Sequence, residues 1–214
     1  MAMTYETLEL DYVGVKAPQF SYHRLKGANP VANVEMASTG EVACLGENLY
    51  EAYLRAWMST EQMLPKKSIL VSIADTHKSK LLPYLKQLDE KGWEFYSTGG
   101  THAFLSKNGV GSYFVCKASE RSEPNIQTLI AQRKVDLIIN LPTANGINTL
   151  TDGYTIRRMA VDHHIPLITN LQIAQIMLQC LIDFKGQTPE GVISWQEYIE
   201  RHVPYQQHMK AIAL

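Results

Sequence analysis

Several features are scarce or missing in this sequence, and each absence excludes a class of function. The 20 Lys and Arg residues nearly balance the 21 Asp and Glu residues, so the net charge of −1 indicates no broad basic face for nucleic acid. No apolar run approaches the roughly 18 residues that a membrane span needs. The three cysteines show no C-x-x-C spacing, which argues against a disulfide framework or a zinc cluster. We therefore expect no metal, no nucleic-acid partner and no membrane partner, and a reducing, cytoplasmic location.

The 214 residues are 45% hydrophobic, which is enough for a core of ordinary size, and their patterning divides the chain into three parts. Residues 1–64 hold short β-like pieces and then an amphipathic helix. Residues 65–184 alternate regularly between strand and helix patterns, and residues 185–214 form a polar tail with one helical stretch. The β-like pieces of the first part lie at 8–15, 19–22 and 42–45, and its helix at 47–59.

The middle part carries the clearest periodicity. Residues 68–73 and 136–141 are continuous apolar runs, which is typical of strands buried on both faces. Five strands are predicted at 68–73, 93–97, 112–116, 136–141 and 166–169, and the helices at 79–91, 101–107, 125–132, 153–164 and 171–184. This alternation predicts an α/β fold: a five-stranded parallel sheet with helices on both faces.

Polar residues follow the predicted strands. In a parallel sheet, ligands bind outside the carboxyl ends of the strands, so these residues are candidates for one site. Glycines and a helix N-terminus let backbone N–H groups approach an anion, and lysines supply positive charge, so the set favours a phosphorylated small molecule. A strand–helix turn with a threonine N-cap is the alternative explanation for the glycines. The candidates are Lys78, Thr98, Gly99, Gly100, Thr101, Lys117, Asn140 and Thr143.

Two sets of motifs resemble a known family. Residues 151–162 (TDGYTIRRMAVD) and 165–170 (IPLITN) resemble the methylglyoxal-synthase-like domain at the C-terminus of the large subunit of carbamoyl phosphate synthetase. Residues 97–101 (STGGT) and 139–142 (INLP) agree with it. Two earlier stretches, 14–27 (GVKAPQFSYHRLKG) and 34–42 (VEMASTGEV), resemble the last segment of that enzyme's second ATP-grasp unit. The resemblance implies a methylglyoxal-synthase-like fold preceded by a small β-rich ATP-grasp remnant.

The resemblance also implies a role. In that family the domain is allosteric, and nucleotide-binding members hold the effector's phosphate at positions matched here by Lys78, Thr98, Thr101 and Lys117. Asn140 matches the asparagine that helps to hold the nucleoside. Members that respond to N-acetylglutamate carry a tryptophan at the position of Lys117 and asparagines at those of Thr143 and Gly153. The resemblance therefore favours a uridine nucleotide or phosphoribosyl pyrophosphate, although Leu141-Pro142 replaces two threonines, which implies different base recognition.

Catalysis, by the same resemblance, belongs to the parent enzyme. ATP, Mg and bicarbonate bind in an ATP-grasp core that lies upstream of residue 1, so we expect this chain alone to be inactive and to hold no cofactor. Its expected partners are the phosphorylated effector, the catalytic ATP-grasp portion and, indirectly, a glutaminase subunit or domain. The helix at 47–59, with Trp57 expected in the core, is a candidate coupler between the two portions.

Two enzymes share features with this pattern. A methylglyoxal-synthase-type lyase uses a carboxylate base and a histidine, and the matching positions here are near Glu123 and at Thr149. The proton-transfer set is therefore incomplete. The cyclohydrolase domain of purine synthesis shares the STGGT turn but lacks its basic signature here. The Arg157-Arg158 pair binds an anion, pairs with Asp152 or Asp162, or contacts the catalytic portion.

Overall fold

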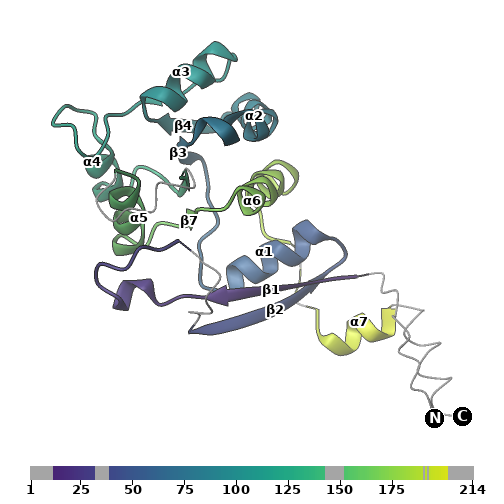
Figure 1. Ribbon diagram of the computed structural model, residues 1–214. Helices are drawn as coiled ribbons and strands as arrows, with labels where there is room; N and C mark the ends of the chain where they lie inside the picture. The colour runs from purple at the N-terminus through teal and green to yellow at the C-terminus, as the bar shows by residue number, and fades with distance from the viewer. Residues whose placement is uncertain (1–11, 32–38, 143–151, 190, 192, 202–214) are drawn as a thin grey trace, which may run out of the picture.

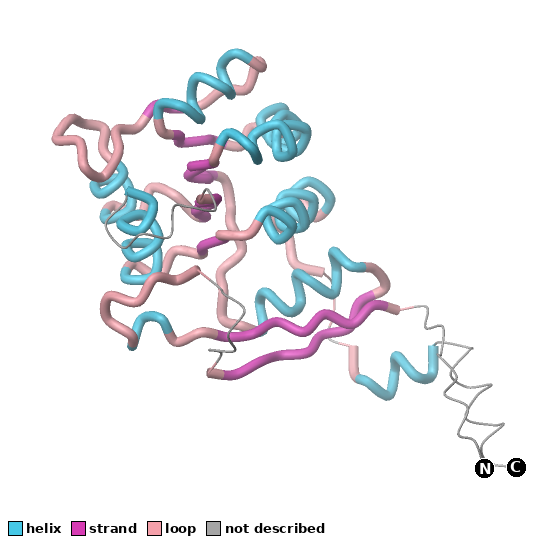
Figure 2. Tube along the Cα trace, viewed as in Figure 1, coloured by secondary structure: helices cyan, strands magenta, loops and turns pink. Residues whose placement is uncertain are grey.

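The computed structural model describes residues 12–31, 39–142, 152–189, 191 and 193–201. A parallel sheet flanked by helices forms one part, and an antiparallel strand pair with its own helix lies beside it (Figure 1). In the pair, β1 (Val13–Gln19) and β2 (Gly40–Gly46) are antiparallel and α1 (Leu49–Ser59) packs on them (Figure 2). Where residues 19–22 were expected to form a strand, the chain instead leaves β1 and enters a 3₁₀ turn, η1 (Tyr22–Arg24).

The sheet of five strands is parallel throughout, as the sequence predicts, with the order β5-β4-β3-β6-β7. Its strands are β3 (Ser68–Ile73), β4 (Glu94–Ser97), β5 (Tyr113–Phe114), β6 (Leu137–Leu141) and β7 (Leu167–Ile168). The helices that follow the strands are α2 (Asp75–Glu90), α3 (Gly99–Lys107), α4 (Ile126–Ala131), α5 (Asp152–Asp162) and α6 (Leu171–Asp183), and a short helix α7 (Trp195–Arg201) comes last.

Side chains of β3 alternate between two hydrophobic clusters. Ile69 and Val71 pack in a cluster with residues of α2, α3 and α6, whereas Leu70 packs with residues of α4 and α5. Because successive strand residues point to opposite faces, the two clusters are the two faces of the sheet. Figure 1 shows the same division, with α4 and α5 on one side of the strands and α2 and α6 on the other. The central strands are therefore covered on both faces.

The first part of the chain shares the core of the sheet. Leu54 of α1 lies in the same cluster as Leu178 of α6, and Asn48 caps α1 by accepting hydrogen bonds from the N–H groups of Tyr50 and Glu51. Trp57, expected in the core, is half-buried and packs against this cluster, and its indole N–H donates to the carbonyl of Met63 over 3.1 Å. Among the described helices, none has the length and apolarity to cross a bilayer.

Candidate functional site

Lys78 lies in the first turn of α2, beside the start of α3. Its ammonium donates to the carbonyl of Gly100 over 2.6 Å and pairs with the carboxylate of Asp75 at 2.6 Å. The Lys78 side chain is only 8% exposed, whereas that of Asp75 is 94% exposed. The lysine is therefore fixed beneath the first turn of α3, and its acidic partner is free to exchange that contact for water.

Gly99 and Gly100, which precede the helix predicted at 101–107, are the first residues of α3. Thr98 is the N-cap residue, but its side chain makes no capping hydrogen bond. An α-helix leaves its first N–H groups without intrahelical acceptors and concentrates positive potential there. Because Lys78 lies against the same turn, two sources of positive potential coincide at Gly99 and Gly100.

Thr101 has a structural contact of its own. Its side chain is 3% exposed, and its hydroxyl lies 3.3 Å from the backbone N and 3.4 Å from the carbonyl oxygen of Ile73. These contacts join the first turn of α3 to the carboxyl end of β3. The threonine therefore positions the α3 N-terminus relative to the strand that leads to Lys78.

The other candidates reach the same edge of the sheet from other strands. Lys117 follows β5 and is exposed; its backbone N–H donates to Glu120, and no carboxylate pairs with its ammonium among the described residues. Asn140 lies in β6 and is 3% exposed. Thr143 falls outside the described residues. The structure thus brings Lys78 together with Gly100, and sets Lys117 and Asn140 on either side along the edge.

A buried arginine lies behind Asn140. Arg157 of α5 is fully buried and donates from Nη1 to Oδ1 of Asn140 over 2.7 Å and from Nε to Oδ1 of Asn29 over 2.9 Å. Burial lowers the pKa of this guanidinium from its ordinary value, because the charged form loses its hydration. The arginine pair was conspicuous in the sequence, but nothing there singled out Asn29 as its partner.

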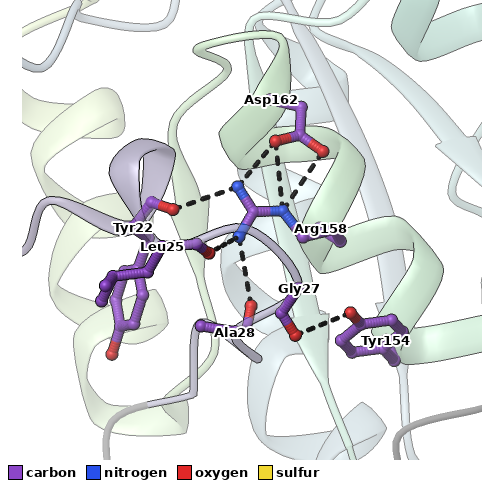
Figure 3. A network of polar contacts seen from close by, with 7 residues as sticks. All are labelled: Tyr22, Leu25, Gly27, Ala28, Tyr154, Arg158 and Asp162. Carbon is purple, nitrogen blue, oxygen red and sulfur yellow. Dashed lines mark hydrogen bonds and ion pairs between the residues drawn. The ribbon is translucent and has the colours of Figure 1, made fainter.

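Two neighbouring residues of α5, Tyr154 and Arg158, contact the chain just before Asn29 (Figure 3). Arg158 donates to the carbonyls of Tyr22, Leu25 and Ala28, and its Nη2 pairs with Asp162 at 2.6 Å. Tyr154 donates its hydroxyl to the carbonyl of Gly27 over 2.8 Å. The ion pair between Arg158 and Asp162 is one of those the sequence predicts. These backbone contacts show that α5 also holds residues 22–28, most of which lie in the stretch 14–27 that resembles the ATP-grasp unit.

The residues considered for proton transfer have other partners. One carboxylate oxygen of Glu123 accepts from the N–H of Asn125 and the other from the hydroxyl of Thr128, so Glu123 is held at the start of α4. Thr149 lies outside the described residues. Cys116, which precedes Lys117 in the chain, is buried, and burial raises the pKa of its thiol.

Comparisons with known proteins show what this chain is similar to. Residues 80–169 match the family model described as "MGS-like domain". The chain is 42% identical over 200 residues to the multifunctional protein ura1 of Schizosaccharomyces pombe. The aligned region is 88% of this chain and 9% of that protein. It is 36% identical over 192 residues to the mitochondrial carbamoyl-phosphate synthase (ammonia) of Homo sapiens, covering 88% of this chain and 13% of that protein.

These relatives are much longer than the chain, which spans only about a tenth of their length. The multifunctional protein CAD of Squalus acanthias, 42% identical over 83% of this chain, is matched over 8% of its own length. Among solved structures, a methylglyoxal synthase from Elizabethkingia anophelis NUHP1 superposes with a TM-score of 0.46 and 19% identity, covering 66% of this chain and 95% of that one.

Proposed function

Because this chain belongs with the carbamoyl phosphate synthetases and its residues 80–169 form an MGS-like domain, we propose that it is the effector-binding regulatory region of such an enzyme. The chain binds a small phosphorylated effector at the carboxyl edge of its sheet. In this proposal, ATP, Mg and bicarbonate bind elsewhere in a glutamine-dependent parent enzyme of pyrimidine or arginine biosynthesis. Three free cysteines fit a reducing compartment, and we propose the cytoplasm.

The observation that carries this proposal is the meeting of Lys78 with the first turn of α3. The ammonium is held 2.6 Å from the carbonyl of Gly100, beside N–H groups that the Thr98 side chain leaves uncapped. A phosphate placed there receives backbone hydrogen bonds and a lysine charge together, which is how helix N-termini bind phosphates. To make room, Asp75 leaves Lys78, and its 94% exposed carboxylate loses little by doing so.

Lys117 and Asn140 define the rest of the proposed site. Lys117 adds a second, exposed positive charge for a diphosphate or triphosphate, and Asn140 offers an amide to the nucleoside or ribose. A lysine rather than a tryptophan at position 117 is the reason for proposing a uridine nucleotide or phosphoribosyl pyrophosphate rather than N-acetylglutamate. Thr143 completes the proposed set.

Calorimetric titration of the 214-residue chain tests this proposal. UTP, UMP, IMP, phosphoribosyl pyrophosphate, N-acetylglutamate and ornithine are added in turn. Saturable binding of one phosphorylated compound, weakened in Lys117→Ala, supports the proposal. Lys107→Ala is the matched control, because Lys107 is an exposed lysine in the last turn of α3, away from the proposed site. Turnover of dihydroxyacetone phosphate to methylglyoxal would instead identify a lyase.

A further inference from the structure

We propose that Arg157 is a positioning residue that couples the proposed effector site to the N-terminal segment at residues 22–31. One arm of its guanidinium holds Asn140 at the carboxyl edge of the sheet, and another holds Asn29 in that segment. The inference rests on the proposed function, since it names the route by which an effector at that edge acts on the segment that follows β1 and overlaps the stretch 14–27 resembling the ATP-grasp unit.

The contacts make Arg157 the shared partner of both asparagines. Its Nη1 lies 2.7 Å from Oδ1 of Asn140, and its Nε lies 2.9 Å from Oδ1 of Asn29. An asparagine amide has one oxygen and one NH₂ group, so the bond to Oδ1 fixes which end of Asn140 faces away from Arg157. The NH₂ of Asn140 then remains to donate to an oxygen of the effector. Arg157 therefore selects an effector that presents an acceptor at this point.

The charge of Arg157 has an unusual environment. The side chain is fully buried, and within the described part of the chain its hydrogen-bond acceptors are two neutral amides rather than carboxylates. Among the described residues, Nη2 of Arg157 and Nδ2 of Asn29 are buried donors without an acceptor. Buried donors are satisfied almost everywhere in proteins, and each exception calls for an explanation. In this proposal, the two donors take up new acceptors when the bonds around Arg157 rearrange on effector binding.

The segment on the far side of Arg157 is well placed to carry a signal. Arg158 and Tyr154 fasten the carbonyls of Tyr22 and Gly27 to α5, so this segment moves with the helix (Figure 3). The same segment continues β1, which pairs with β2 and contacts α1. A shift of Asn140 on effector binding is thus passed through Arg157 to Asn29, and by linkage a shift of the segment changes effector affinity to the same extent.

A double-mutant cycle on the full chain tests the link without any ligand. Asn29→Ala and Asn140→Ala are made singly and together, and urea midpoints are measured. Because both asparagines share Arg157, their effects are expected to overlap. Each substitution is expected to lower the urea midpoint less than half as much when the other asparagine is already replaced as it does in the wild type. In an Arg157→Lys background, which keeps the charge but not the two-armed geometry, the shifts are expected to add. Additive shifts in the wild-type background would overturn the proposal.

Ligand binding gives the second readout, and Asn108→Ala is the matched control. The Asn108 side chain, just after α3, donates to the carbonyl of Phe104 and contacts neither asparagine of the junction. With UMP or phosphoribosyl pyrophosphate as probe, Asn29→Ala is expected to weaken binding at least threefold, and Asn108→Ala to leave it unchanged. The probe is also expected to shift the NMR signal of the Arg157 Nε–H.

The two proposals fail in different ways. If no phosphorylated compound binds the wild-type chain, the proposed function is wrong, and the urea cycle still decides whether Arg157 joins the two asparagines. If a compound binds but Asn29→Ala keeps wild-type affinity and the Arg157 signal stays in place, the effector site stands and the coupling through Arg157 is refuted.

Discussion

Replacing Arg158 by Met is expected to release the N-terminal segment from α5. The substitution keeps the apolar stem and removes the guanidinium, which donates to three backbone carbonyls at 3.0, 3.1 and 3.2 Å. At about 1 kcal/mol for each bond, the loss is about 3 kcal/mol in the free energy of unfolding. The ion pair adds little, because the Asp162 side chain is 55% exposed and exposed pairs contribute about 0–1 kcal/mol. Asp162→Asn is thus the matched control, with a loss below about 1 kcal/mol.

Urea unfolding of the two variants measures this difference directly, and hydrogen exchange locates it. In Arg158→Met, the amides of Leu25 and Ala28, which are hydrogen-bonded within the segment, are expected to exchange faster than in the wild type. Amides of β3, at the centre of the sheet, are expected to rank in protection from exchange as they do in the wild type. Equal losses in Arg158→Met and Asp162→Asn would refute the reasoning, because the carbonyl contacts would then contribute nothing beyond the ion pair.

Two further predictions concern acid stability and close packing. Burial opposes ionisation of Asp136, but hydrogen bonds from the backbone and hydroxyl of Ser68 and from the backbone of Lys67 and Lys66 lower its pKa below the ordinary 3.8. The stabilisation that the ionised Asp136 contributes is therefore present above about pH 4 and is lost as pH falls through the folded-state pKa. Below about pH 4, the urea midpoint of Asp136→Asn is expected to fall less steeply with pH than that of the wild type. A Cβ at Gly46 would overlap the backbone N of Ala52, so Gly46→Ala is expected to lower the unfolding free energy by about 1–3 kcal/mol. A Cβ at Gly40 lies 3.9 Å from its nearest neighbour, so Gly40→Ala is expected to be nearly neutral in the same urea assay.

Strands with continuous apolar runs were predictable because their pattern arises from burial on both faces. Residues 68–73 match β3 at both ends. Helix starts were less predictable: α3 begins at Gly99 and α2 at Asp75, several residues before the apolar period becomes visible. Glycine is a poor helix former, so its presence in a first turn hides the helix from patterning. Residues 19–22 have the composition of a strand, but β1 ends at Gln19 and the chain enters a 3₁₀ turn at Tyr22. The carbonyl of Tyr22 accepts a hydrogen bond from Arg158 of α5, a contact that local patterning does not reveal.

The residues of the candidate site that follow strands could be predicted from the sequence. The residues whose contacts come from distant parts of the chain could not. Lys78 and the glycines follow adjacent strands, so the parallel topology brings them together. Asn170, which also follows a strand, has the plainer role of capping α6 by accepting from the N–H of Ile173. The burial of Arg157 depends on Asn29, which lies 128 residues away in the sequence. No local pattern shows that an arginine will be buried, because its partners come together only in the folded chain.

The central claim is that the edge of the sheet near Lys78 and Lys117 binds a phosphorylated effector. Calorimetric titration of the full chain with UTP, UMP, IMP, phosphoribosyl pyrophosphate, N-acetylglutamate and ornithine tests it most directly. Saturable binding of one phosphorylated compound is expected, at least tenfold weaker in Lys117→Ala and unchanged in Lys107→Ala. Absence of binding by every compound, or binding that Lys117→Ala leaves intact, would contradict it.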